Sequence, residues 1–412
     1  MVNVLLESIR KNQIQIAMEH TNALQIVQKD TFEGVETIMA TIAIAASSSV
    51  RLQSQLVGLT FMRITTPADP TQEETELRAD KVIEKQNMLE KNLDRLQKAS
   101  HEMSLDVEGN YSKAESFIRS AAAQGAQLAV LPEYHLQGWV GSREALLGSA
   151  RRSPEFLARY RALARELGVC IVPGTLLEDV SAPSDAHDEP ALANVAYFLG
   201  PDGAVCGRYQ KRNLWHPEKP LLRAPSGDGD GATPHHIAFD TPLGVRAGML
   251  VCWDLSFPEA FRALAADGAR LVVVPSFWVA RDVGEPVNPV NRHAERLFLD
   301  TMCVARAFEN SCAVVYVNCG GATAAEAETA AGTVREGHDA EGREHAGVSQ
   351  AAMPMVGAVA RIGHGAEEMR VVELDLGLLE VAEKAYKPRD DMERRGWKYE
   401  ADVSGIWRTQ DL

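Results

Sequence analysis

The sequence lacks the short motifs by which many proteins hold a metal ion or a nucleotide. It contains no Cys-x-x-Cys and no His-Glu-x-x-His, two spacings that bring zinc ligands together. It also contains no Gly-x-x-x-x-Gly-Lys and no Gly-x-Gly-x-x-Gly, which are typical of phosphate-binding loops. We therefore expect no bound metal and no cofactor.

Excess positive charge and long apolar runs are lacking too. The 412 residues carry a formal net charge of −15, which disfavours nucleic acid and anionic membrane surfaces as partners. The longest weakly polar stretch, Thr37–Val50, is too short for a membrane span. The first residues show no basic region followed by an apolar core, so we expect no secretory signal.

The six cysteines do not have the spacing of a disulfide framework. They are scattered along the chain at Cys170, Cys206, Cys252, Cys303, Cys312 and Cys319. Such usage is typical of free thiols in a reducing compartment. We expect a cytoplasmic protein.

The chain divides into a charged N-terminal part and a longer part with alternating patterns. Within residues 1–105, Met1–Lys29 and Thr31–Met62 have helical apolar spacing. Thr71–Met103 alternates acids and bases around a narrow apolar seam, so we expect a helical extension of unknown role, either a bundle or a short coiled coil. Predicted strands and helices then alternate over residues 106–319, which indicates an α/β domain.

One cysteine stands where a predicted strand turns into a predicted helix. The apolar run Val245–Val251 predicts a buried strand that ends at Cys252. Ser256 with Glu259 predicts a capping box for the helix Pro258–Asp267. A thiol near the positive end of a helix is stabilised as the thiolate, the form that attacks carbonyl carbon. A buried cysteine with a purely structural role is the equal alternative.

Two charged residues follow other predicted strands. Glu133 comes directly after the short apolar run Leu128–Leu131. Lys211 follows a predicted hairpin of Asn194–Gly200 and Val205–Gln210. Each alone is typical of a surface charge, but together with the cysteine they supply a base, a cation and a nucleophile at strand ends, where α/β active sites lie.

The sequences around these residues closely resemble the nitrilase superfamily of carbon–nitrogen hydrolases. The matching segments are Leu128-Ala-Val-Leu-Pro-Glu133, Gly207-Arg-Tyr-Gln-Lys211 and Gly248-Met-Leu-Val-Cys252-Trp-Asp-Leu-Ser-Phe-Pro-Glu259. Ala305–Asn310 and Gly347–Gln350 support them further along the chain. Three motifs in the family's order are far more specific than any one of them.

The resemblance implies a fold and a set of roles. Residues 106–412 would form the four-layer αββα sandwich of the nitrilase type. Cys252 would be the nucleophile, Glu133 the general base and acid, and Lys211 the oxyanion-stabilising cation. The backbone N–H of Trp253 would be a second oxyanion donor, and Glu218 would orient the lysine or the substrate.

The resemblance also implies a small-molecule substrate and a homo-oligomer, a dimer or larger. Trp253 is typical of many nitrilases, whereas Asp254 and Phe257-Pro258-Glu259 are more like the amidases. An amide is therefore the first expectation, with a nitrile or an N-carbamoyl compound as the alternative. A hydrolase-like domain used as a catalytically weak interaction module is a further alternative.

A cysteine–histidine hydrolase is the competing interpretation of the thiol. His216, His235, His236 and His293 are the possible bases. None of them lies in a papain-like or caspase-like sequence, so this interpretation is disfavoured.

One part of the family pattern is missing. The family opens with a strand before an Asp-x-x-x-Asn segment, which Asp106–Asn110 provides here. The charged stretch Thr71–Met103 stands where that strand belongs, and Gln55–Thr65 is the only strand-like run nearby. The domain either lacks one strand or recruits one from the extension, and we favour a detached helical module.

The C-terminal third contains a predicted loop, a hairpin and a tail. Residues 320–344 are rich in Ala, Gly and Glu without apolar period, which predicts a mobile loop. Met355–Ile362 and Met369–Leu374 predict a hairpin, and Leu376–Glu383 predicts a helix. The aromatic tail 384–412 is expected to dock, either at a subunit interface or on its own domain.

Overall fold

The computed structural model describes six stretches of the chain: 106–181, 190–225, 236–284, 287–329, 335–339 and 342–394. Residues 322–342 belong to a different compact unit from the rest of these stretches, and each unit is described by itself. The expectations for the helical extension 1–105, the strand-like run Gln55–Thr65 and most of the tail lie outside the described residues.

The first of two sheets lies in the N-terminal half of the larger unit. Its strands are β1 (Leu128–Val130), β2 (Cys170–Val172), β3 (Thr175–Asp179), β4 (Leu192–Leu199) and β5 (Val205–Gln210). The order is β1-β2-β4-β3, with β5 also paired to β4. β1 and β2 are parallel, while β4 runs antiparallel to its neighbours. The predicted hairpin of β4 and β5 is confirmed.

The second sheet contains six strands in the order β11-β10-β9-β8-β7-β6. They are β6 (Phe239–Asp240), β7 (Arg246–Met249), β8 (Leu271–Ser276), β9 (Ala313–Asn318), β10 (Gln350–Met353) and β11 (Gly357–Arg361). The central strands β7, β8 and β9 are parallel, and they are almost continuously apolar, as expected for strands buried on both faces.

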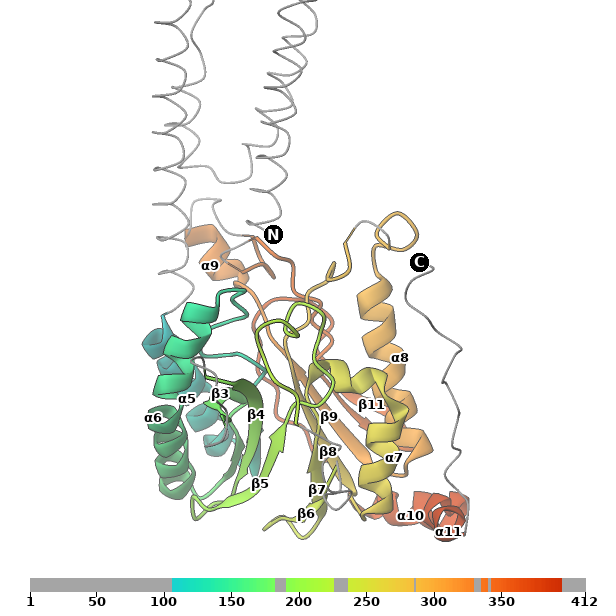
Figure 1. Cartoon of the computed structure of the whole chain (residues 1–412). Coiled ribbons are helices and arrows are strands. Elements are labelled where there is room, and N and C mark those ends of the chain that lie inside the picture. Colours follow the sequence, from blue (N-terminus) through green and yellow to red (C-terminus); the bar gives the residue numbers. More distant parts are fainter. Residues whose placement is uncertain are drawn as a thin grey trace, which may run out of the picture. The chain divides into compact units, whose positions relative to one another are not determined.

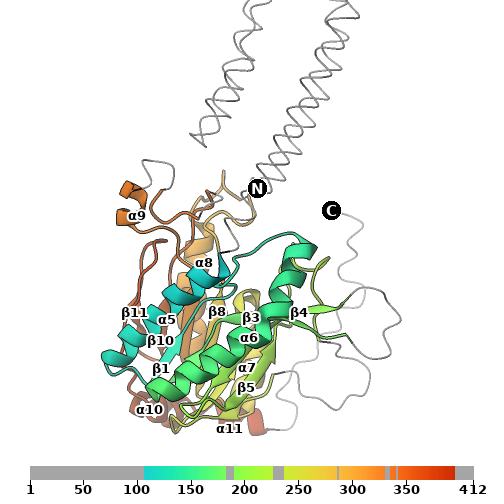
Figure 2. The same cartoon turned by 90° about the vertical axis from the view of Figure 1, so that its left-hand side faces the viewer.

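Helices cover the outer face of each sheet (Figures 1 and 2). α5 (Val107–Ala123) and α6 (Arg143–Leu167) pack on the first sheet, and α7 (Pro258–Ala266) and α8 (Ala294–Glu309) pack on the second. Two short helices, α10 (Gly377–Tyr386) and α11 (Pro388–Glu393), follow β11. The predicted αββα sandwich is therefore confirmed for the described part of the larger unit.

The two sheets meet through one apolar layer. Phe198 of β4 contacts Phe239 of β6 edge to face, with ring centroids 5.4 Å apart, and Val172 and Val272 are buried in the same cluster. Because this layer excludes water, any charged group that the strands carry inward must find a partner within the protein.

The local predictions around the nucleophile turn need a correction. The helix α7 begins at Pro258, but its N-cap is Phe257 and no side chain caps it. The Ser256 hydroxyl is buried without a partner among the described contacts, so the predicted capping box is wrong. A short 3₁₀ helix, η1 (Cys252–Ser256), intervenes because Asp254 turns back to accept a hydrogen bond from the Val251 N–H.

The C-terminal hairpin was also predicted wrongly. β11 pairs with β10, and Met369–Leu374 forms no strand. The turn between the two strands uses the left-handed region at Met355 and at Gly357, which lets the chain reverse within three residues. The segment predicted as a loop, 320–344, includes a short helix, α9 (Ala324–Thr329), in the smaller unit.

β1 lies at the edge of its sheet among the described residues. It pairs with β2, and no described strand lies on its other side. Its three residues are half-buried. The strand that the family pattern places before Asp106 falls in the part of the chain that the structure does not describe. Among the residues that the structure describes, we find no helix with the length and apolar character of a membrane span.

Candidate active site

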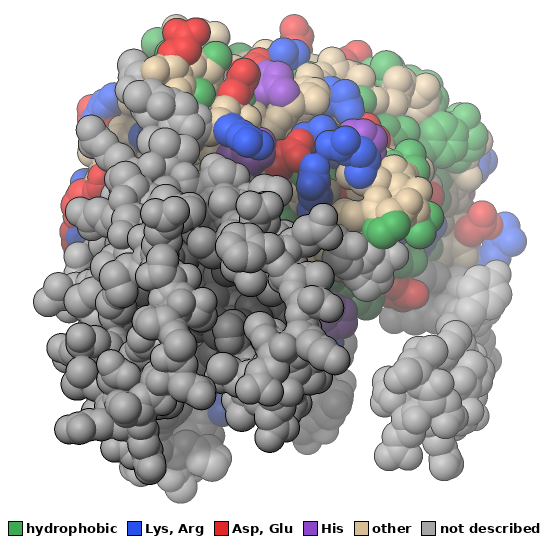
Figure 3. All heavy atoms as spheres, turned by 90° about the horizontal axis from the view of Figure 1, so that it is seen from above, with side chains coloured by type: hydrophobic (Ala, Val, Ile, Leu, Met, Phe, Trp, Pro, Cys, Tyr) green, Lys and Arg blue, Asp and Glu red, His purple; other side chains and the backbone are tan. Residues whose placement is uncertain are grey.

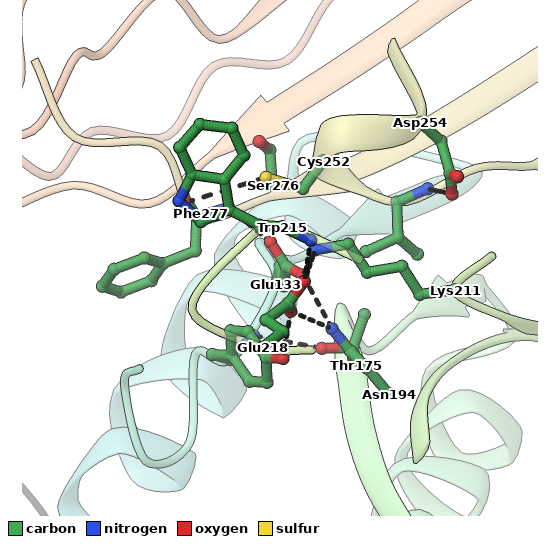
Figure 4. Close-up of polar contacts among 12 residues, drawn as sticks. Glu133, Thr175, Asn194, Lys211, Trp215, Glu218, Cys252, Asp254, Ser276 and Phe277 are labelled. Atoms are coloured by element: carbon green, nitrogen blue, oxygen red, sulfur yellow. Dashed lines mark hydrogen bonds and ion pairs between the residues drawn. The ribbon is translucent and has the colours of Figure 1, made fainter. Parts of the chain in front are cut away.

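Three charged or nucleophilic side chains meet between the two sheets. Glu133 follows β1, Lys211 follows β5, and Cys252 follows β7 after two residues. Figure 4 shows the three side chains pointing toward one another, and all are buried, with 1%, 1% and 7% of their surface exposed. Lys211 Nζ donates to Glu133 Oε1 over 2.8 Å. The structure thus brings together the three residues that the sequence singled out.

One peptide segment connects the thiol to the carboxylate. The Phe277 N–H donates to Glu133 Oε2 over 2.9 Å, and the Phe277 carbonyl accepts a contact from Cys252 Sγ at 3.8 Å. Phe277 directly follows β8. The end of the central strand therefore positions the base and the nucleophile against each other.

Glu218 completes a buried charge cluster. Its Oε2 lies 2.8 Å from Lys211 Nζ, and the Trp215 N–H donates to the same oxygen over 2.7 Å. The Tyr134 hydroxyl donates to Oε1 over 2.5 Å. The lysine is thus held between two carboxylates, and Glu218 lies where the sequence suggested an orienting glutamate.

Asn194 is a member of the cluster that sequence reasoning missed. Its Nδ2 donates to Glu133 Oε1 over 2.7 Å and approaches Glu218 Oε1 at 3.5 Å. Asn194 is fully buried within the apolar strand β4. A lone amide in such a strand has to be hydrogen-bonded, and that signal was available in the sequence.

The sequence named Asp254 only as an amidase-like residue, and in the structure it connects the nucleophile turn to the segment after Lys211. Its Oδ1 accepts from the Asn213 N–H and Nδ2 at 3.0 and 2.8 Å. Its Oδ2 accepts from the Tyr209 hydroxyl and the Val251 N–H, both at 2.9 Å. Four hydrogen bonds to one buried carboxylate fix Cys252 relative to Lys211.

The backbone is strained at two positions beside the cluster. Cys252 and Tyr134 adopt φ values of 48° and 54°, a region that costs a residue with a side chain about 1–2 kcal/mol. A close approach occurs at Gly174, where a Cβ would lie 1.8 Å from the Pro132 carbonyl oxygen. Only glycine therefore lets the β2–β3 connection pass directly behind Glu133.

Burial controls the protonation of these groups. Burial raises the pKa of the Cys252 thiol well above its ordinary value, the charge of Glu133 raises it further, and Lys211 opposes both. The pKa of Glu133 is raised by burial, lowered by Lys211 and raised by Glu218. Burial lowers the pKa of Lys211, but the two carboxylates outweigh this effect and raise it well above its ordinary value.

The expectation of a thiolate stabilised by a helix N-terminus is therefore wrong for the resting protein. Burial and the neighbouring carboxylate raise the pKa of the thiol, which favours the neutral form, and α7 begins six residues later. A neutral thiol next to a base has to lose its proton as it attacks. The pKa of Lys211, in contrast, is raised by its two carboxylate neighbours, which favours the protonated form.

Aromatic rings pack against one another next to Cys252 and Glu133. Trp253 contacts Trp215 and Trp278, with ring centroids 4.6 and 5.7 Å apart. On the Glu133 side, the Tyr134 ring lies 5.4 Å from Trp139 and 6.3 Å from Phe277. Aromatic side chains with a few polar groups among them are typical of sites that bind small organic molecules.

The histidines considered as bases have other contacts. The His216 ring lies 4.9 Å from Trp215, His236 stacks on Tyr209, and His293 precedes α8. His235 lies outside the described residues. Over the described stretches, no group of three or more His, Cys, Asp or Glu side chains is arranged to hold a metal ion.

Comparison with known sequences finds the same family across most of the chain. The sequence profile of the carbon–nitrogen hydrolases matches residues 95–384. An (R)-stereoselective amidase of Pseudomonas sp. is 29% identical over 68% of this chain and 84% of its own length. A nitrilase of Pyrococcus abyssi is 35% identical over 42% of this chain. The match spans only 60% of that nitrilase.

Solved structures share the fold. A carbon–nitrogen hydrolase from Helicobacter pylori G27 has a TM-score of 0.56 at 20% identity, covering 70% of this chain and 91% of its own. A mutant of the amidase from Nesterenkonia sp. AN1 has a TM-score of 0.50 at 25% identity, covering 69% and 91%. With a family profile that matches well over half of its length, this chain belongs to the carbon–nitrogen hydrolases of the nitrilase superfamily.

Proposed function

We propose that this protein hydrolyses a non-peptide carbon–nitrogen bond of a small molecule, most simply an amide, through a thioester on Cys252. The observation that carries the proposal is the segment at Phe277, whose N–H holds Glu133 and whose carbonyl receives the Cys252 thiol. Lys211 contacts the other oxygen of Glu133, so a nucleophile, a base and a cation lie next to one another.

The first half of the reaction forms the thioester. Cys252 Sγ adds to the amide carbon while Glu133 takes the thiol proton, so the neutral resting thiol needs no prior ionisation. Lys211 and the backbone N–H of Trp253 stabilise the negative charge that develops on the amide oxygen. Glu133 then gives its proton to the leaving nitrogen, and the C–N bond breaks.

The second half releases the acid. Glu133, ionised again, takes a proton from a water molecule that attacks the thioester carbon. The new tetrahedral adduct uses the same oxyanion donors and collapses to expel Cys252, which recovers its proton. Glu218 acts as a positioning residue, because it holds Lys211 at 2.8 Å without reaching the thiol in the described contacts.

Amide hydrolysis has the broader support, and nitrile or N-carbamoyl hydrolysis is the second candidate. The Nesterenkonia amidase carries the acetamide moiety of fluoroacetamide on its active-site cysteine, and the Pseudomonas relative is an amidase. One relative is named a nitrilase, and another, from Arabidopsis thaliana, an N-carbamoylputrescine amidase. Turnover of matched amides, nitriles and N-carbamoyl compounds distinguishes these candidates.

A catalytically weak interaction module is disfavoured by the cost of the cluster. Two carboxylates and an ammonium group are removed from water here, and burying charges is costly unless they are paired. Apolar residues of similar size often stabilise a fold as well or better. Buried charges that cost free energy of desolvation are easier to explain by catalysis than by stability, which supports a chemical role for the cluster.

We also propose a homo-oligomer in the cytoplasm. Large apolar side chains are exposed on α8, near β11 and on α10, including Leu297, Val356 and Val381 at 60%, 55% and 53%. A second copy would cover them. All six cysteines are free, as in reducing compartments. Light scattering that gives the mass of a monomer would contradict the oligomer.

Substitutions of single residues in the cluster should affect turnover and thermal stability to different extents. Cys252→Ala and Glu133→Gln are expected to lower kcat at least ~100-fold, because each removes a group that acts in every step. Both should keep the thermal midpoint near that of the wild type. Lys211→Ala should also cost about 3–5 kcal/mol of stability, because it leaves two buried carboxylates without their cation.

Steady-state kinetics and thermal unfolding measure both effects, with Cys206→Ala as the matched control, since Cys206 is a half-buried thiol outside the cluster. Near-normal turnover by Cys252→Ala would contradict the mechanism.

The pH profile should report Glu133. Its ionised form is the base, and its pKa lies above 4.5 because of burial, so kcat/KM should fall as the pH drops through that raised value. Glu218 raises the pKa of Glu133, so Glu218→Gln should move the acidic limb to lower pH besides slowing turnover. If Glu218→Gln lowers activity but the acidic side of its kcat/KM profile stays at the wild-type pH, Glu218 has a purely structural role.

A further inference from the structure

An arginine lies over the aromatic wall next to the candidate active site. The Arg343 guanidinium carbon is 5.2 Å from the centre of the Phe277 ring, within cation–π range. Its Nη1 also contacts the Trp139 carbonyl at 3.4 Å. Since the Phe277 backbone touches both Glu133 and Cys252, a single residue separates this cation from the proposed reacting groups.

The segment that carries Arg343 is held in place on both sides. Two residues later, the His345 ring packs edge to face against the Phe277 ring at 5.5 Å. The Ala280 N–H donates to the Glu344 carbonyl, and the Ala346 N–H to the Trp278 carbonyl. The segment Trp278–Ala280, which follows β8, therefore runs antiparallel to residues 344–346, and these contacts hold the backbone next to Arg343.

Two acidic side chains, Asp282 and Glu295, also lie near Arg343. Burial raises the pKa of Asp282 to about 7, with Glu295 and Glu133 raising it and Lys211 and Arg343 lowering it. Glu295 is held by the Trp278 indole N–H at 2.6 Å, and burial raises its pKa as well. Burial thus favours the neutral form of both acids, whereas a guanidinium keeps its charge.

The buried cluster of Glu133, Lys211 and Glu218 contains one cation, and that cation is not available to bind an anionic group of the substrate. Lys211 is already shared by Glu133 and Glu218. The whole chain is acidic, with a net charge of −15, and repels anions at long range. On the face shown in Figure 3, basic side chains gather among a few acidic ones. An anionic substrate therefore depends on a local cation such as Arg343.

We propose that Arg343 binds a carboxylate carried by the substrate, so that the protein prefers C–N compounds with a carboxylate a few bonds from the scissile carbon. The inference rests on the proposed function. A guanidinium has five N–H donors in a planar fork that fits a carboxylate. Arg343 contacts the ring of the residue whose backbone contacts Glu133 and Cys252, so a carboxylate bound there would be carried near the scissile carbon.

The carboxylate could belong to the acyl group or to the nitrogen side, and matched substrate pairs distinguish these sources. A comparison of glutaramic acid with its methyl ester tests a carboxylate on the acyl side. A comparison of N-carbamoyl-β-alanine with butylurea tests a carboxylate on the nitrogen side. For each pair, the measured quantity is the ratio of kcat/KM for the anionic compound to that for the neutral one.

Arg343→Gln should lower this ratio about 10- to 100-fold for at least one pair, mainly through a higher KM, as expected for losing a charge-assisted hydrogen bond. Arg343→Lys should retain part of it, because an ammonium group keeps the charge but not the fork. Arg281→Gln is the matched control, since Arg281 is exposed and directed at Glu344 at 3.9 Å, and it should leave the ratio unchanged.

A ratio unaltered by Arg343→Gln in both pairs would overturn the proposal, and so would a wild-type preference for the neutral compounds. If Arg343 has only a structural role, Arg343→Gln should lower kcat/KM equally for both compounds of a pair. If neutral amides are turned over in a Cys252-dependent way while the ratio is unaltered, only the role of Arg343 fails. No turnover of any compound would overturn the proposed function and this inference together.

Discussion

The fold around the candidate site depends on one buried ion cluster, in which Lys211 lies between Glu133 and Glu218. Taking three charges out of water costs several kcal/mol for each ion, so the surroundings have to satisfy every one of them. Asn194 and the Phe277 N–H donate hydrogen bonds to Glu133. The Tyr134 hydroxyl and the Trp215 N–H donate to Glu218. These partners come from β4 and from the segments after β1, β5 and β8, so both sheets must be assembled before the cluster is complete.

The nucleophile is positioned by backbone rather than by its own side chain. Cys252 occupies a left-handed conformation, and Asp254 holds the turn in that conformation through four hydrogen bonds. A carboxylate with four donors is well satisfied even when fully buried. A thiol whose pKa is raised by burial can lie beside the base, because on the proposed mechanism the proton moves only when a carbonyl carbon arrives.

Much of the fold and of the site was predictable from sequence. The apolar runs at strands β1, β7 and β9 and the residues at their ends located Glu133 and Cys252, because burial and strand ends leave clear patterns. The cap of α7 and the pairing of β11 were not predictable, because they depend on Asp254 turning back and on a tight turn with positive φ. Asn194 was readable in principle, as a polar residue inside an apolar strand. The path of the Arg343 segment across Phe277 had no sequence signal.

The central claim is that Cys252 carries the acyl group of the substrate during turnover. The most direct measurement is peptide mass mapping after an acid quench of the protein mixed with an amide that it hydrolyses. The account predicts that the peptide containing Cys252 gains the mass of the acyl group and that the gain disappears once the substrate is exhausted. An acyl group found on another residue during turnover would contradict it.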